Sequence, residues 1–342
     1  MSIPAPSTQK FGLANKTLAN VTTAANACNS WLHQLLKTLL GSTTGFTAGT
    51  GGAPPSSAYW TIESSSNGTT ASTADNFSAA YVAGEWLSNT AGNAHSWFVI
   101  KSPASPGILD GPWYILVSKD SATATTYRVS LSKTAWNTNG TATADPTNGG
   151  TVSTTGSTSQ FNPSSTTAGK SHFYCDAKGN FAFMCSRDGA GLVETLFMFS
   201  ELEQNQPSGD TLRAIGYIAH STSGIFNQVN SGSNLSGASI LGFQRNGAAH
   251  ASSQLIITSH NIPLTELNGI NSDVEGFKWG FVISTLTGNQ AVRGCVLDMY
   301  QCTTGITNGA NYPDTINPIW SAIGSTSTGG KMLIPMPNVL AL

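Results

Sequence analysis

The chain has 342 residues, of which 39% are hydrophobic, enough for a sizeable core, and its formal net charge is −2. Only 9% of the residues are charged, whereas ordinary globular chains carry roughly 25%. Lysine and arginine are scattered singly, so no basic stripe can neutralise phosphates, which argues against a nucleic-acid partner. No apolar run approaches the ~18 residues of a membrane span, which argues against a membrane partner.

Glycine (36 residues), serine, threonine and asparagine replace the missing charges. A surface of hydroxyl and amide groups repels copies of itself less than a charged surface does, so the composition indicates assembly or an extracellular surface. The first residues, MSIPAPSTQKFG, lack the apolar stretch of a secretion signal, and we expect synthesis in the cytosol.

The five cysteines have neither zinc-site spacing nor an even number, so a complete disulfide framework is not expected. We predict buried thiols, which suit assembly in a reducing cytosol. These residues are Cys28, Cys175, Cys185, Cys295 and Cys302.

The N-terminal part is predicted to be an extended arm over 1–14, a helix over 15–40 and a linker over 41–57. In the helix, apolar residues recur every three or four positions, and Gly41 stands where a C-terminal stop is expected. This stripe predicts either a coiled-coil seam or a helix lying on a β core, and the second interpretation is favoured because flanking charges are irregular. The stripe is Leu18, Val21, Ala25, Cys28, Leu32, Leu35 and Leu39.

The centre of the chain, from His95 to Ser118, predicts two strands joined by a turn. Apolar residues fall on alternate positions, and the segment SPASPGILDG between the two runs must turn because of its prolines and glycines. Further strands are predicted at 58–64, 126–132, 171–176, 180–186, 193–199, 212–220, 238–243, 253–259, 277–285, 292–302 and 331–337.

Short strands at this spacing predict a mainly β protein: a sandwich- or barrel-like antiparallel core with one N-terminal α-helix and long Gly/Ser/Thr/Asn loops. The segment 134–169 is predicted to be a surface excursion, and 303–330 is turn-rich. We divide the chain into an N-terminal unit (1–57) and a β-rich core (58–342), with two β subdomains, 58–165 and 166–342, as an option.

No pattern of reactive residues predicts an enzyme, a cofactor site or a metal site. The six histidines are spread along the chain. The segments 176–179 and 186–189 resemble ion-binding loops, but their Asp and Gly content is more typical of ordinary turns. Tryptophans could form a sugar-binding platform, yet Trp97, Trp113 and Trp279 are flanked by apolar alternation, which is typical of a core.

Two segments, TAGNAHSWFVIKSP and PWYILVSKD, resemble a pattern in virion structural proteins of tailed bacteriophages, in which an HSW strand follows a Gly-rich loop. The segments YWTIESSSNG and HFYCDAKGNFAFMCSRDG are similar in style, so the resemblance covers about residues 58–200. It implies a structural part of the particle, such as the tail, baseplate or collar, and it carries over no catalytic residues.

The first hypothesis is therefore a non-enzymatic virion protein, made in the host cytoplasm, that assembles symmetrically with its own copies and docks to other virion proteins. The alternative is a carbohydrate-binding or host-recognition module of a tail fibre, with a host surface glycan as ligand. A secreted S-layer-like protein is a third option, weakened by the absence of a signal sequence.

Apolar residues of the two ends and of the helix stripe are the candidates for contacts between subunits. An assembling subunit can lay such end segments over a neighbour. The alternative interpretation is that the two ends are ordinary frayed termini without a partner. The candidate assembly residues are Ile3, Phe11, Leu18, Val21, Leu32, Leu35, Leu39, Ile334 and Val339.

Overall fold

The computed structural model describes a chain of antiparallel strands with one α-helix and a short 3-10 helix in its described part. The described residues are 10–17, 24–48, 52–65, 96–103, 112–119, 127–132, 152–156, 169–187, 193–201, 212–220, 239–244, 255–263, 275–284, 291–302, 311–312, 320–324 and 331–335. This arrangement confirms the prediction of a mainly β fold with antiparallel sheets and one helix.

The largest sheet has seven strands in the order β12-β11-β10-β9-β8-β1-β2. Its strands β8 to β11 follow one another as hairpins, whereas β1 joins β8 from far away in the sequence. The strands are β1 (Lys10–Thr17), β2 (Thr47–Ala48), β8 (Gly169–Asp176), β9 (Phe181–Arg187), β10 (Val193–Glu201), β11 (Leu212–His220) and β12 (Ser239–Gln244).

The second sheet has five strands that follow one another in chain order. They are β3 (Thr61–Ser65), β4 (Ser96–Lys101), β5 (Tyr114–Lys119), β6 (Tyr127–Ser132) and β7 (Val152–Gly156). The third sheet has the order β13-β14-β15-β18-β17-β16. Its strands are β13 (Leu255–Pro263), β14 (Glu275–Ser284), β15 (Ala291–Cys302), β16 (Asn311–Tyr312), β17 (Trp320–Gly324) and β18 (Lys331–Pro335).

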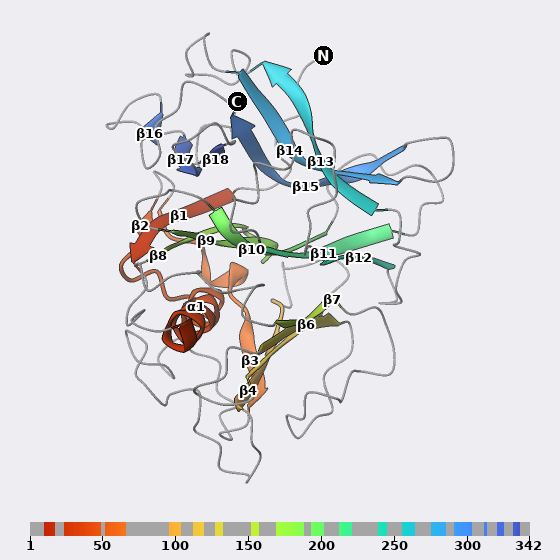
Figure 1. Ribbon diagram of the computed structural model, residues 1–342. Helices are drawn as coiled ribbons and strands as arrows, with labels where there is room; N and C mark the ends of the chain where they lie inside the picture. The colour runs from red at the N-terminus through yellow and green to blue at the C-terminus, as the bar shows by residue number, and fades with distance from the viewer. Residues whose placement is uncertain are drawn as a thin grey trace.

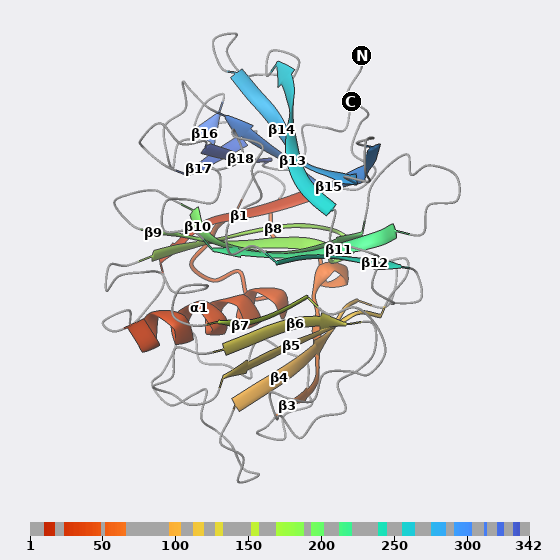
Figure 2. The same cartoon turned by 45° about the vertical axis from the view of Figure 1, so that its right-hand side comes forward.

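The three sheets are stacked, with the seven-stranded sheet in the middle (Figures 1 and 2). Helix α1 (Ala24–Leu39) and the five-stranded sheet lie on one face of the middle sheet, and the six-stranded sheet lies on the other. All three sheets are open, each with two edge strands among the described residues.

An aromatic core fills the space between the middle sheet, α1 and the five-stranded sheet. Trp60 meets Phe181 and Phe199 edge to face, with ring centroids 5.7 and 5.9 Å apart. Phe183 of β9 pairs across the sheet with Phe173 and Phe197. Full burial of each such side chain contributes about 1.5–3 kcal/mol, so this cluster makes a large contribution to the stability of the fold.

The opposite face of the middle sheet is buried as well. Both faces therefore need apolar side chains, which explains the nearly continuous apolar runs in β9 and β10. A strand with only one buried face would alternate apolar and polar residues. The buried side chains on this second face include Tyr174, Ala182, Met184, Leu196, Met198 and Ile215.

The central strand pair is buried on both faces too. In the β4–β5 ladder Ile100 pairs with Ile115 and belongs to the main core with Trp113, whereas Val99 pairs with Leu116 and forms a separate buried cluster with it. The prediction that Trp113 is a core residue is confirmed. The side chains of Trp97 and Trp279 lie outside the description.

Helix α1 ends as the sequence predicts, but it begins later. The amide of Gly41 donates to the Thr38 carbonyl oxygen (3.1 Å) and that of Ser42 to the Lys37 carbonyl oxygen (2.8 Å). These two bonds form a Schellman motif, which needs a left-handed residue, and Gly41 has φ 105°. A Cβ on Gly41 would also lie 2.6 Å from the Tyr59 ring.

The predicted helix over 15–40 is wrong at its start, because residues 10–17 form β1. Phe11 pairs with Cys175 and Leu13 with Phe173, so a ladder to a distant strand replaces the local helical pattern. The segments predicted as a surface excursion and as turn-rich also contain strands, β7 in the first and β16 and β17 in the second. Because β1 lies in the same sheet as β8, the 1–57 unit contributes a strand to the β-rich part.

Candidate functional site

One group of polar contacts surrounds the turn between β8 and β9, which the segment after α1 touches. Trp60 donates its Nε1–H to the Gly179 carbonyl oxygen (3.0 Å), and the Ser57 hydroxyl donates to the Ala177 carbonyl oxygen (3.2 Å). The Trp60 amide donates to the Leu39 carbonyl oxygen of α1 (2.8 Å). One residue thus joins the helix end, the start of the five-stranded sheet and a turn of the middle sheet.

Gly179 is required at this turn for two reasons. Its φ is 98°, in the left-handed region, and a Cβ there would lie 2.7 Å from Cγ of Pro103 and 3.3 Å from the Ala58 carbonyl oxygen. Any other residue would therefore be strained in its backbone and crowded against two neighbouring segments.

The carboxylate of Asp176 is fully buried and holds the turn closed. Oδ1 accepts from the amides of Lys178 (2.8 Å) and Asn180 (3.1 Å), and Oδ2 accepts from Nδ2 of Asn180 (2.7 Å). The Asn180 Oδ1 accepts from the Glu201 amide (3.0 Å), which links the turn to β10. With three donors already bound, this carboxylate forms an Asx-type turn, as the ordinary-turn interpretation of 176–179 predicts. Of the second loop, 186–189, residues 188–189 lie outside the described residues.

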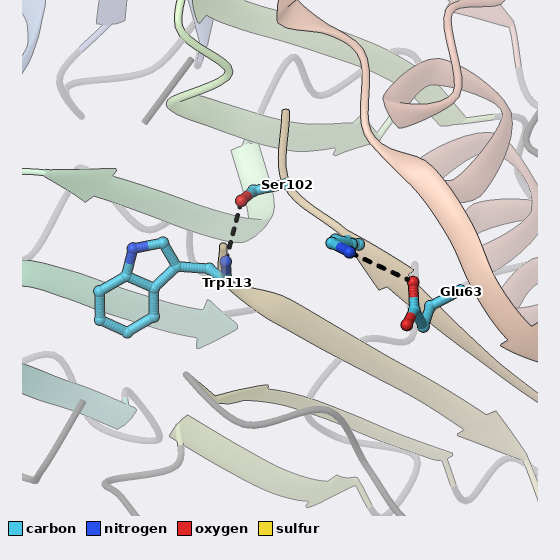
Figure 3. A network of polar contacts seen from close by, with 4 residues as sticks. Glu63, Ser102 and Trp113 are labelled. Atoms are coloured by element: carbon cyan, nitrogen blue, oxygen red, sulfur yellow. Dashed lines mark hydrogen bonds and ion pairs between the residues drawn. The ribbon is translucent and has the colours of Figure 1, made fainter. Parts of the chain in front are cut away.

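A second polar group closes the β4–β5 hairpin. Figure 3 shows the Trp113 amide donating to the Ser102 hydroxyl, at 2.9 Å. The Ser102 amide donates in return to the Trp113 carbonyl oxygen, at 2.8 Å. In the same view Lys101 Nζ lies 3.7 Å from Glu63 Oε2 across the β3–β4 ladder, with both side chains more than a third exposed. Such exposed pairs contribute about 1 kcal/mol or less, so this pair adds little to stability.

Helix α1 is buried on its polar face as well as on its apolar face. Gln34 Nε2 donates to Thr38 Oγ1 (2.8 Å), and Thr38 Oγ1 donates to the backbone carbonyl oxygen of Gln34 (2.7 Å). A helix with a clear polar stripe normally turns that stripe to water, so its burial is a finding that the sequence did not predict. The buried stripe is Ser30, His33, Gln34, Lys37 and Thr38.

The side chain of Lys16 binds the segment that follows the C-terminal end of α1. Its ammonium donates to the Thr44 carbonyl oxygen and lies 5.6 Å from the centroid of the Phe46 ring. Burial lowers the pKa of Lys16, and the nearby charge of Lys37 lowers it further. Two lysines at this end suit the partial negative charge of a helix C-terminus.

Among the described residues, His172 has a pKa far below the usual value of a histidine. It lies fully inside the second face of the middle sheet, and burial, with a smaller effect of Lys170, lowers its pKa to about 3. The imidazole is therefore neutral near pH 7 and poorly suited to act as a general base there. Tyr59 has a raised pKa, mainly through burial, and its hydroxyl donates to the Pro54 carbonyl oxygen (2.6 Å).

Four of the candidate assembly residues lie in the core of the chain itself. Phe11 is only 4% exposed, and Leu32, Leu35 and Leu39 are at most 1% exposed, all within the core of the same chain. They serve intrachain packing, as the interpretation of a helix on a β core predicts. Ile334 lies in β18 opposite Ser321, with only its backbone described. The remaining candidates, Ile3, Leu18, Val21 and Val339, lie outside the described residues.

The cysteine prediction is confirmed for the two cysteines whose side chains are described: Cys175 and Cys185 are buried thiols. Among the described residues no group of three His, Cys, Asp or Glu side chains could hold a metal ion. In the same part of the chain no helix is long and apolar enough to cross a bilayer.

Comparisons of the chain with protein-family models, with curated proteins and with solved structures found no match. Sequence reasoning missed the role of Trp60, because its partner Gly179 is 119 positions away. The Asp176–Asn180 turn had a readable signal, an Asp followed by Gly and Asn between two strands.

Proposed function

We propose that this protein is a non-enzymatic structural component of a bacteriophage virion, of the tail, baseplate or collar type. It assembles symmetrically with its own copies and docks to other virion proteins. The observation that carries the proposal is the use of the described polar groups. The buried Asp176 carboxylate accepts three hydrogen bonds within a turn, the Ser102 hydroxyl accepts from the Trp113 amide, and the Trp60 indole donates to the Gly179 carbonyl oxygen, so each group ties segments of the chain together. These groups fix a scaffold and do not converge on a reacting centre.

Composition and sequence resemblance support the same proposal. A surface with few charges and many hydroxyl and amide groups tolerates burial against identical copies. The HSW and PWYILVS segments that resemble phage virion proteins contain β4 and β5, which are packed on both faces, as a rigid particle component requires.

The test is the protein composition of purified particles. Particles from a lysate that encodes this chain should contain its peptides at a fixed copy number after density-gradient purification, and gold-labelled antibody should mark one place on the particle. Peptides that remain in the soluble fraction, with unlabelled particles, would contradict the proposal.

The second candidate, recognition of a host glycan, depends on exposed tryptophans. Three of the eight tryptophans, Trp31, Trp60 and Trp113, are buried in the core and cannot form a sugar platform. This candidate therefore rests on the other five and on the long polar loops. Saturable binding of the purified chain to host cells or to a glycan array, lost on competition with the free sugar, would favour it over the structural role.

A further inference from the structure

Six strands form the sheet edges in the described part of the chain: β2, β12, β13, β16, β3 and β7. An edge strand presents unpaired N–H and C=O groups and can pair with another chain unless it is short, bulged, charged or covered. Comparing the six edges by these criteria shows which one carries the fewest of these protections among the described residues.

Five of the edges carry a recognised protection. Strands β2 and β16 have two residues each. In β3 a register shift between Ile62 and Ser64 leaves Glu63 as an extra, charged residue. Strands β7 and β12 are five and six residues long, and they lie against each other as well as against β11 and β13, respectively.

Strand β13 also lies against β12, but it is longer than the other edges and has neither a charge nor a bulge of its own along its ladder. It has nine residues, LIITSHNIP, with no Asp, Glu, Lys or Arg, and its one proline is the last residue, Pro263. It pairs with β14 over its whole length. The irregularity in that ladder places Thr258 opposite Phe281 and Ser259 opposite Trp279, so the extra residue is Gly280 on β14 and β13 itself stays continuous.

The six-stranded sheet has a second stretch that pairs on one side only among the described residues, the part of β15 before Tyr300, but this stretch is less regular. Only the last three residues of β15, Tyr300–Cys302, pair with β18. The preceding part of β15 contains two register shifts against β14 and carries Arg293 and Asp298. Bulges and charges are devices that block edge pairing, so β13 is the better template of the two.

We propose that β13 is the docking edge for a second copy of this chain, paired antiparallel about a two-fold axis at Ser259. The proposal rests on the proposed function, because it names the surface through which the self-assembly begins. Pairing of β13 with itself places Ile256 opposite Ile262 of the second copy and satisfies the backbone groups on that edge in both copies at once. An uncharged strand also meets no repulsion from its own copy, which makes an identical chain a suitable occupant.

A cysteine cross-link tests the register directly. Residues opposite each other in antiparallel strands have Cα atoms about 4.5–5.5 Å apart, within the range that a disulfide bridges. Ser259→Cys in the full chain should therefore give a covalent dimer under mild oxidation that a reductant reverses. The matched control is Ser321→Cys in β17, an inner strand paired with both β16 and β18. Equal dimer yields from the two variants would overturn the proposal.

Backbone substitution tests the edge without a new thiol. Successive N–H groups of a strand point to opposite sides, so of Thr258→Pro and Ser259→Pro one should remove an outward donor. That variant should keep the wild-type circular dichroism spectrum and show at least tenfold weaker self-association in sedimentation velocity. Wild-type association of both folded variants, or a monomeric wild type at the highest concentration, would overturn the proposal. If neither proline variant folds, the cross-link decides.

The two proposals fail separately. Particles that contain the protein and still form with β13 variants would remove the edge assignment and leave the virion role. A β13-dependent dimer that is absent from particles would remove the virion role and leave the edge assignment.

Discussion

The indole of Trp60 and the carbonyl oxygen of Gly179 are joined by a 3.0 Å hydrogen bond between residues 119 positions apart. This bond ties the segment after α1 to the β8–β9 turn, at a place where Pro103, two residues after β4, also lies close to the turn. The junction is therefore where the helix, the middle sheet and the five-stranded sheet meet, and the first two predictions concern it.

Gly179→Ala should destabilise the fold by about 1–3 kcal/mol, because it adds a Cβ to a left-handed residue and crowds Pro103. Gly52→Ala is the matched control, since Gly52 also has a positive φ (78°) but has no atom within 4 Å of its added Cβ. Denaturant unfolding should show the larger loss at Gly179. Equal losses would mean that crowding at the turn is unimportant.

Trp60→Phe should cost about 1–3 kcal/mol, because it leaves the buried Gly179 carbonyl oxygen without its indole donor while keeping most of the ring packing. Trp60→Ala should cost more, about 3–5 kcal/mol, since it also opens a cavity against Phe181 and Phe199. Thermal and denaturant melts of both variants measure the order. A Trp60→Phe protein as stable as wild type would show that the bond contributes nothing.

Leu32→Asp should prevent folding, because it places a carboxylate at a position that is fully buried between α1 and the sheets, at a cost of several kcal/mol. Thr44→Asp, at an exposed residue just after the helix, is the control and should melt close to wild type. Circular dichroism and soluble yield give the readout. A folded Leu32→Asp variant that fails only to assemble would restore Leu32 as an interface residue.

Deleting residues 1–14 should unfold the chain, because it removes most of β1, including the buried Phe11 and Leu13. Deleting residues 1–9 leaves β1 intact and should preserve the fold. Comparing the melting curves of the two truncations separates a role in the sheet from a role in assembly. A stable 1–14 deletion would show that β1 is dispensable.

Acid should destabilise the fold through His172. Its pKa is about 3 in the folded chain, whereas an unperturbed histidine has a pKa of 6.5, so the unfolded state binds more protons between these values. Stability is therefore complete above about pH 6.5 and falls as the pH drops toward 3, by up to ~1.4 kcal/mol per pH unit. His172→Gln should flatten the dependence between pH 6.5 and 5, where few carboxylates titrate. Denaturant unfolding at several pH values measures the slope, and an unchanged slope in the variant would exclude His172 as its source.

Local patterns in the sequence determined the elements whose signals are complete within a few residues. The short apolar segment 212–220 predicts β11 with its observed bounds, the AKG turn predicts the β8–β9 hairpin, and Gly41 predicts the end of α1. Strand period and turn chemistry act between near neighbours, so one sequence suffices to read them.

Only the tertiary structure decided which segments meet across long distances in the chain. Residues 15–17 fall in the segment predicted as a helix, yet they extend β1 because the edge of β8, more than 150 positions later, supplies a ladder. Phe11 belongs to the core and the polar stripe of α1 is buried for the same reason. Pairing and burial depend on a partner that the local sequence does not contain, and the free energy of burying both faces of the middle sheet outweighs the small local preferences of the chain.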